Sequence, residues 1–69
     1  MTLAILYKTG RFEIYDDVYE LNVGNNELTF KSSKQPAVLA RGCFFKPLDE
    51  ISKVSVNGII YYEDGKVKL

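Results

Sequence analysis

The sequence has no histidine and only one cysteine, Cys43, among its 69 residues. Without histidine, the chain lacks the commonest general base and metal ligand of proteins. A lone cysteine allows neither an internal disulfide nor a Cys/His zinc site. We therefore expect no catalytic residue, no metal site and no bound cofactor, and the sequence favours a non-enzymatic function.

Long hydrophobic runs are also missing. The apolar run nearest the amino terminus covers only residues 3–6, which is too short for the core of a signal peptide or for a membrane span. A single unpaired cysteine is typical of a reducing compartment. These features predict a cytoplasmic protein without a membrane partner.

The short chain predicts one small β domain over residues 1–69. Its apolar content of 46% is ordinary for a folded protein and argues against disorder. A domain of this size buries only ~60% of its unfolded surface and often needs a disulfide or a metal to hold it. Because neither is expected here, stability has to come from a compact core, from self-association or from a partner.

The formal net charge is zero, so no general attraction to nucleic acid or membrane is expected. The charges are nevertheless segregated along the chain. The segment between Phe12 and Phe30 has no base and contains five acids: Glu13, Asp16, Asp17, Glu20 and Glu27. The segment between Leu28 and Leu48 has no acid and contains four bases: Lys31, Lys34, Arg41 and Lys46. These blocks are either solvated strand faces or two oppositely charged docking patches.

Short runs of β-branched and aromatic residues alternate with turn residues, and no long window has helical periodicity. The sequence therefore predicts a mainly β fold. We expect a small antiparallel meander of about six strands that forms an open barrel or roll, with one or two short helical turns.

Two hairpins are predicted in the first half of the chain. A two-residue loop at Thr9-Gly10 gives a strand pair whose apolar face holds Leu3, Ile5, Tyr7, Phe12 and Ile14. A two-residue loop at Asn25-Asn26 gives a half-buried pair whose apolar face holds Tyr19, Leu21, Val23, Leu28 and Phe30.

The closing stretch carries two turn signals, and Asn57-Gly58 is the strongest hairpin signal in the chain. A two-residue loop at Asp64-Gly65 would make the apolar side chains change faces along the sheet. We therefore predict a three-residue loop over 63–65, with Gly65 in a bulge. The inner face is then Val54, Val56, Ile59, Tyr61, Val67 and Leu69, and the outer face is Lys53, Ser55, Ile60, Tyr62, Lys66 and Lys68.

The segment 36–45 has two interpretations. Pro36 and Gly42 would suit a short helix over Ala37–Arg41, whereas the apolar residues would suit a strand over Val38–Phe45. In a strand, at least one of Phe44 and Phe45 should be buried, because neighbouring side chains point to opposite faces. The following residues, 47–52, predict one helical turn.

Two candidate binding surfaces follow from these assignments. The first is an acidic segment with tyrosines, which are enriched at protein interfaces: Tyr15, Asp16, Asp17, Tyr19 and Glu20. The second is a basic sheet face with an aromatic ring, which could stack a base and neutralise phosphates: Lys53, Ile60, Tyr62, Lys66 and Lys68. Both sets also fit ordinary solvated turns and cross-strand neighbours.

These surfaces favour a small protein-binding or regulatory module, such as an inhibitor or accessory protein of the type found on phages and mobile elements. A protein partner is expected. One alternative is a homo-oligomeric structural component that pairs through open sheet edges at Leu3–Tyr7 or at the C-terminal strand. The other is a nucleic-acid-binding small β-barrel, which is less favoured because the chain has no excess positive charge.

Overall fold

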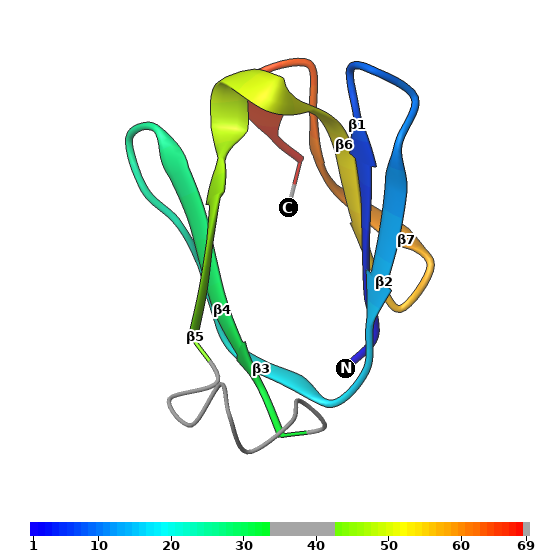
Figure 1. Cartoon of the computed structure of the whole chain (residues 1–69), viewed down its shortest axis with the longest axis vertical. Coiled ribbons are helices and arrows are strands. Elements are labelled where there is room, and N and C mark those ends of the chain that lie inside the picture. The colour runs from blue at the N-terminus through cyan, green and yellow to red at the C-terminus, as the bar shows by residue number, and fades with distance from the viewer. Residues whose placement is uncertain (34–42, 69) are drawn as a thin grey trace.

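The computed structural model describes residues 1–33 and 43–68, and within them the chain forms eight strands in two antiparallel sheets (Figure 1). The first sheet has the order β2-β1-β6-β7-β8, with strands β1 (Leu3–Tyr7), β2 (Phe12–Tyr15), β6 (Ile51–Val56), β7 (Ile59–Glu63) and β8 (Lys66–Val67). The second sheet has the order β3-β4-β5, with strands β3 (Val18–Val23), β4 (Glu27–Ser32) and β5 (Cys43–Pro47). The predicted mainly β fold is therefore confirmed, with eight strands rather than about six.

One helical turn joins the two sheets. The 3-10 turn η2 (Leu48–Glu50) follows β5 and leads directly into β6, as the sequence predicts for this stretch. The strand interpretation holds for the end of the ambiguous segment, since β5 begins at Cys43. The alternative helix over Ala37–Arg41 lies outside the described residues. No helix in the described ranges is long and apolar enough to cross a bilayer.

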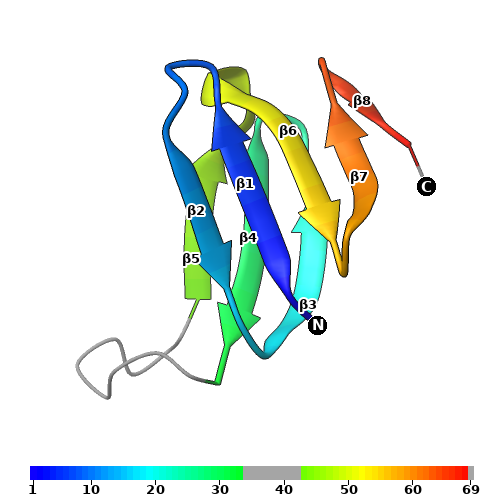
Figure 2. The ribbon, with the colours of Figure 1, turned by 90° about the vertical axis from the view of Figure 1, so that its right-hand side faces the viewer.

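The two sheets lie face to face, and Figure 2 shows the first in front of the second. Their facing side chains form a core whose fully buried members are Leu3, Ile5, Leu28, Phe30, Ile51 and Val54. β1 lies between β2 and β6, so Leu3–Tyr7 is an interior strand and the expectation of an open edge there is wrong. Among the described residues, no element packs over the outer face of either sheet.

The first hairpin has a longer loop than predicted. The Tyr7 N–H donates to the Arg11 carbonyl (2.8 Å) and the Gly10 N–H donates to the Tyr7 carbonyl (2.9 Å), with Gly10 at φ 94°. This is a three-residue loop closed by a glycine bulge. The strands slip by one residue relative to the prediction, and a slip of one residue reverses every side chain. Phe12 and Ile14 therefore point outward, 56% and 59% exposed, instead of into the core.

The second hairpin has the predicted turn but an unpredicted bulge. Val23 pairs with Leu28 across Asn25-Asn26, as expected. The register then shifts between Tyr19 and Asn22. The irregularity turns Val18 into the core and leaves Tyr19 46% exposed, so the inward assignment of Tyr19 is wrong.

The closing hairpins differ from the prediction in the same way. Val56 pairs with Ile59 across the predicted Asn57-Gly58 turn, but the register shifts between Val54 and Ser55, so that Val54 pairs with Tyr62. This bulge moves the apolar side chains from one face of the sheet to the other. The predicted three-residue loop had been chosen to avoid that change of face. A two-residue turn at Asp64-Gly65 then suffices, and the predicted three-residue loop is wrong.

The bulge lies between Ile60 and Tyr62 and reverses the assigned faces from there on, whereas Ile59, which precedes it, keeps its predicted pairing and is nevertheless exposed. Tyr62, predicted outside, is only 5% exposed and belongs to the core. Ile59 and Val67, predicted inside, are exposed, whereas Val54 is buried as expected. Leu69, which the sequence placed on the inner face, lies outside the described residues.

In β5 the two phenylalanines alternate as a strand requires. Phe44 is half-buried against the core, and Phe45 is 61% exposed on the outer face of the second sheet. The prediction that at least one of them is buried holds in part, since Phe44 is partly buried against the core.

Candidate functional site

The outer face of the first sheet is apolar over several strands. Two cross-strand rows define it: Ile14, Ala4, Ser55 and Ile60 in one, and Phe12, Leu6, Lys53 and Glu63 in the other. We call the apolar members, Ala4, Leu6, Phe12, Ile14 and Ile60, the outer apolar face. The second sheet covers the opposite side, so no described element packs over these residues (Figure 2).

The outer apolar face ends at an open sheet edge, because β2 pairs with β1 alone among the described strands. The Tyr7–Arg11 hydrogen bond fixes the alternation of the ladder, so residues 5 and 13 form the next bonded pair. Phe12 and Ile14 occupy the non-bonded positions between these pairs. Their backbone N–H and C=O groups therefore point away from β1, toward solvent. Apolar side chains and unpaired backbone groups thus occur on the same two residues.

A polar network lies on the inward side of the same strand. The Glu13 carboxylate accepts hydrogen bonds from the Tyr7 hydroxyl (2.6 Å) and the Tyr15 hydroxyl (3.0 Å). The same carboxylate lies 3.7 Å from the Arg11 guanidinium and 3.5 Å from Lys46 Nζ on β5. The network therefore joins the edge strands of the two sheets, β2 and β5.

The protonation of this network follows from its geometry. Burial on its own would raise the pKa of the Glu13 carboxyl, but the hydrogen bonds from Tyr7 and Tyr15 and the nearby cations outweigh it and hold that pKa below its ordinary value. Burial raises the pKa of Tyr7, and its bond to Glu13 raises it further. Glu13 is therefore an ionised acceptor at neutral pH and Tyr7 a protonated donor. The network thus pairs a charged acceptor with hydrogen-bond donors and cations from both sheets.

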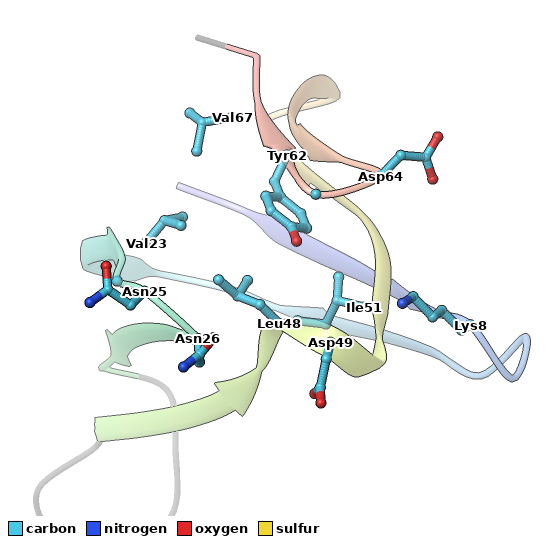
Figure 3. Close-up of a pocket in the computed structure, with 12 residues that line it drawn as sticks. Lys8, Val23, Asn25, Asn26, Leu48, Asp49, Ile51, Tyr62, Asp64 and Val67 are labelled. Carbon is cyan, nitrogen blue, oxygen red and sulfur yellow. The ribbon is translucent and has the colours of Figure 1, made fainter.

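A cleft of about 780 Å³ opens at one end of the molecule, between the β3–β4 turn, η2 and the β7–β8 turn (Figure 3). Its apolar lining is Val23, Leu48, Ile51, Tyr62 and Val67, and Figure 3 shows the Tyr62 ring directed toward Leu48 and Ile51. Its polar lining consists of exposed residues: Lys8, Asn25, Asn26, Asp49 and Asp64. The cleft has the size of a small-molecule site, but its polar groups do not converge on the floor.

The acidic segment predicted to bind protein does not form one face. Tyr15 is half-buried, with its ring centroid 5.0 Å from that of Phe30 and 5.1 Å from that of Phe44. Asp16, Asp17, Tyr19 and Glu20 are exposed, and Glu20 forms an ion pair with Lys31 at 2.8 Å. Asp17 and Glu20 also have left-handed backbone angles, φ 52° and φ 54°. The segment is thus a strained acidic turn and bulge with one outward tyrosine.

The predicted basic face is not assembled either. Lys53 and Ile60 lie on the outer face of the first sheet, but Lys53 forms an ion pair with Glu63 at 3.5 Å. Lys66 and Lys68 are exposed at and beyond β8, while Tyr62 is in the core. The aromatic ring required for base stacking is therefore absent from this surface.

The outer apolar face is the feature that sequence reasoning missed. The signal was present in Gly10, because a three-residue loop closed by that glycine turns Phe12 and Ile14 outward.

Within the described ranges, no three His, Cys, Asp or Glu side chains lie close enough to hold a metal ion. Comparison with protein-family models, with curated proteins and with solved structures found no match to the chain.

Proposed function

We propose that this chain is a small non-enzymatic protein-binding module that docks through the outer apolar face and the adjoining edge of β2. The observation that carries the proposal is the coincidence at Phe12 and Ile14 of exposed apolar side chains with unpaired backbone groups. Exposed apolar patches on small soluble proteins mark interaction sites. An open strand edge adds directional main-chain hydrogen bonds to such a patch.

The partner that fits this surface is a protein that offers an extended strand. Main-chain pairing along β2 would supply affinity, and alternate apolar side chains of the incoming strand would lie beside Phe12 and Ile14. The nearby Lys53–Glu63 ion pair would form part of the polar rim. Nucleic acid fits this surface less well, because Lys53, the cation within its two rows, is paired with Glu63.

Site-specific photo-crosslinking tests the proposal. A benzoylphenylalanine replaces Phe12 in one variant and Phe45 in a matched control, since both are exposed phenylalanines on outward sheet faces. We expect a discrete adduct from position 12 and none from position 45 in cells that make the protein. Mass spectrometry identifies the adduct, and the complex is then rebuilt from purified components with and without Phe12→Lys. Identical adducts from both positions, or a rebuilt complex indifferent to Phe12→Lys, would overturn the proposal.

A further inference from the structure

The four sheet edges within the described residues differ in how they are protected. β8 is two residues long and carries Lys66, and β5 carries Lys46 and Pro47. β3 is interrupted by the irregularity at Glu20. Short strands, lysine, proline and bulges are the devices by which natural sheets avoid pairing with other chains. β2 has no lysine, proline or bulge, and its ladder with β1 is regular. Its one charged side chain, Glu13, points inward and is already paired with Tyr7, Tyr15 and Lys46.

From this contrast, and resting on the proposed function, we infer that the strand docking on β2 is β2 of a second copy of the chain. Two copies of β2, antiparallel about a two-fold axis, would join the two first sheets into one continuous sheet. The occupant is thus the chain itself.

One register satisfies every outward backbone group. If Phe12 lies opposite Ile14 of the second copy, the N–H and C=O groups of both residues pair, which gives four hydrogen bonds across the axis. Shifting the copies by two residues in either direction leaves part of these groups unpaired within the strands. In the paired register, each Phe12 side chain also lies beside an Ile14 side chain on the outer apolar face. Aromatic and β-branched cross-strand neighbours of this kind stabilise sheets.

The charges permit this register. Glu13 would lie near Glu13 of the second copy, and like charges opposite each other normally destabilise a sheet. Here each Glu13 carboxylate is held by two tyrosine hydroxyls and faces both Arg11 and Lys46. Arg11 and Lys46 of both copies thus supply four cations near the two Glu13 carboxylates at the two-fold axis. The polar network described above therefore compensates the charge that a bare Glu13 pair would present.

The interface is small, so the association is expected to be weak, with a Kd on the order of micromolar. Sedimentation velocity from about 5 to about 500 µM should show the mass rising from 7.9 kDa toward twice that value as concentration increases. Ile14→Pro removes an outward N–H and no bond to β1, and Ile14→Lys introduces a protective charge. Each should raise the dimer Kd about tenfold or more. Circular dichroism verifies that both variants fold, and Ile14→Lys stands in if the proline variant does not.

Ile59→Lys is the matched control, because Ile59 is exposed on β7, away from β2, and is not part of the outer apolar face. It should leave the Kd unchanged. A dimer that Ile60→Lys disrupts and Ile14→Lys does not would be a face-to-face dimer and would overturn the edge assignment.

Disulfide trapping tests the register. In a Cys43→Ser background, Phe12→Cys protein is mixed with Ile14→Cys protein and oxidised. The mixture should form a crosslinked dimer much faster than either variant alone. In the proposed register, position 12 of one copy faces position 14 of the other, and neither position faces its own equivalent. Equal rates in all three samples would contradict the register.

The outcomes separate this inference from the proposed function. A chain that stays monomeric at every concentration sinks the self-pairing inference. The proposed function survives that result if position 12 still crosslinks to a foreign protein. The proposed function fails if position 12 gives no adduct distinct from that of position 45, or if the rebuilt complex is indifferent to Phe12→Lys.

Discussion

At the scale of single residues, Glu13 is the side chain on which most interactions converge. It lies on the inward side of an edge strand, where an apolar residue would be ordinary, yet it accepts two tyrosine hydrogen bonds and lies near two cations. A half-buried carboxylate tolerates such a position only when it is paired and hydrogen-bonded. Glu13 therefore links β2 to β5 where the two sheets come together.

The lowered pKa of Glu13 predicts acid sensitivity. A carboxyl whose pKa is lower in the folded state stabilises the fold above its unfolded pKa of about 4.3, and this stabilisation is lost as the pH falls through the folded pKa. Glu13→Gln should lower the free energy of unfolding at pH 7 by about 1–2 kcal/mol. The free energy of unfolding of this variant should also fall less steeply than that of the wild type as the pH drops below ~4.5. Urea unfolding at neutral and acid pH measures both effects. Glu27→Gln, at an exposed position, is the control and should alter neither.

At the scale of elements, two of the four turns were predictable and the bulges were not. Asn57-Gly58 and Asn25-Asn26 turn where the residue types require, because these residues favour tight turns. A bulge is one extra residue that reverses all faces beyond it, and no composition marks its place. Tyr62 was therefore assigned outside and Tyr19 inside. The apolar face change itself was visible in the sequence, and the bulge in β7 is its physical solution.

The outer apolar face was not predicted from the sequence for the same reason. The two candidate sets depended on the assigned faces, so the extra loop residue before Arg11 was enough to hide the outward Phe12 and Ile14. The segregation of charge was read correctly from the sequence, but the pairing of Lys53 with Glu63 depends on a register that the sequence does not specify.

The bulge in β3 gives a prediction at this scale. Glu20 has φ 54° in a strand, a conformation that costs a residue with a Cβ roughly 1–2 kcal/mol and costs glycine little. Glu20→Gly and Glu20→Ala both remove the ion pair with Lys31. The glycine variant should be the more stable of the two by about 1 kcal/mol in chemical unfolding, the reverse of the usual order in strands. The same pair of substitutions at Thr29, in β4, should show the usual order; alanine winning at both sites would contradict the assigned backbone.

At the scale of the whole molecule, the two sheets are held together by a small core with an aromatic cluster. The Phe30 ring stacks on Phe44 at 5.0 Å between centroids and meets Tyr15 edge-on at 5.0 Å. Phe30 itself is almost fully buried. In a domain of this size, a few such side chains supply most of the stabilising burial.

Truncation of this cluster should unfold the molecule. Phe30→Ala is expected to cost about 3–5 kcal/mol, which is comparable to the whole stability of a small domain. Phe45→Ala, which removes an exposed ring from the neighbouring strand, should change stability by less than about 0.5 kcal/mol. Thermal unfolding followed by circular dichroism distinguishes the two. A cooperative transition in Phe30→Ala at the wild-type temperature would contradict the assigned core.

The interior position of β1 has a consequence for how the chain is made. Leu3 pairs with Val56, and the Asn57 N–H donates to the Thr2 carbonyl at 2.8 Å. β1 can therefore complete its sheet pairing only when residues more than fifty positions later are present. On the ribosome, the hairpin of β1 and β2 emerges early with its apolar side chains unsatisfied. Such non-local pairing slows folding and prolongs the exposure of apolar surface to solvent. We therefore expect the nascent chain, before β6 is made, to be the state most prone to aggregation.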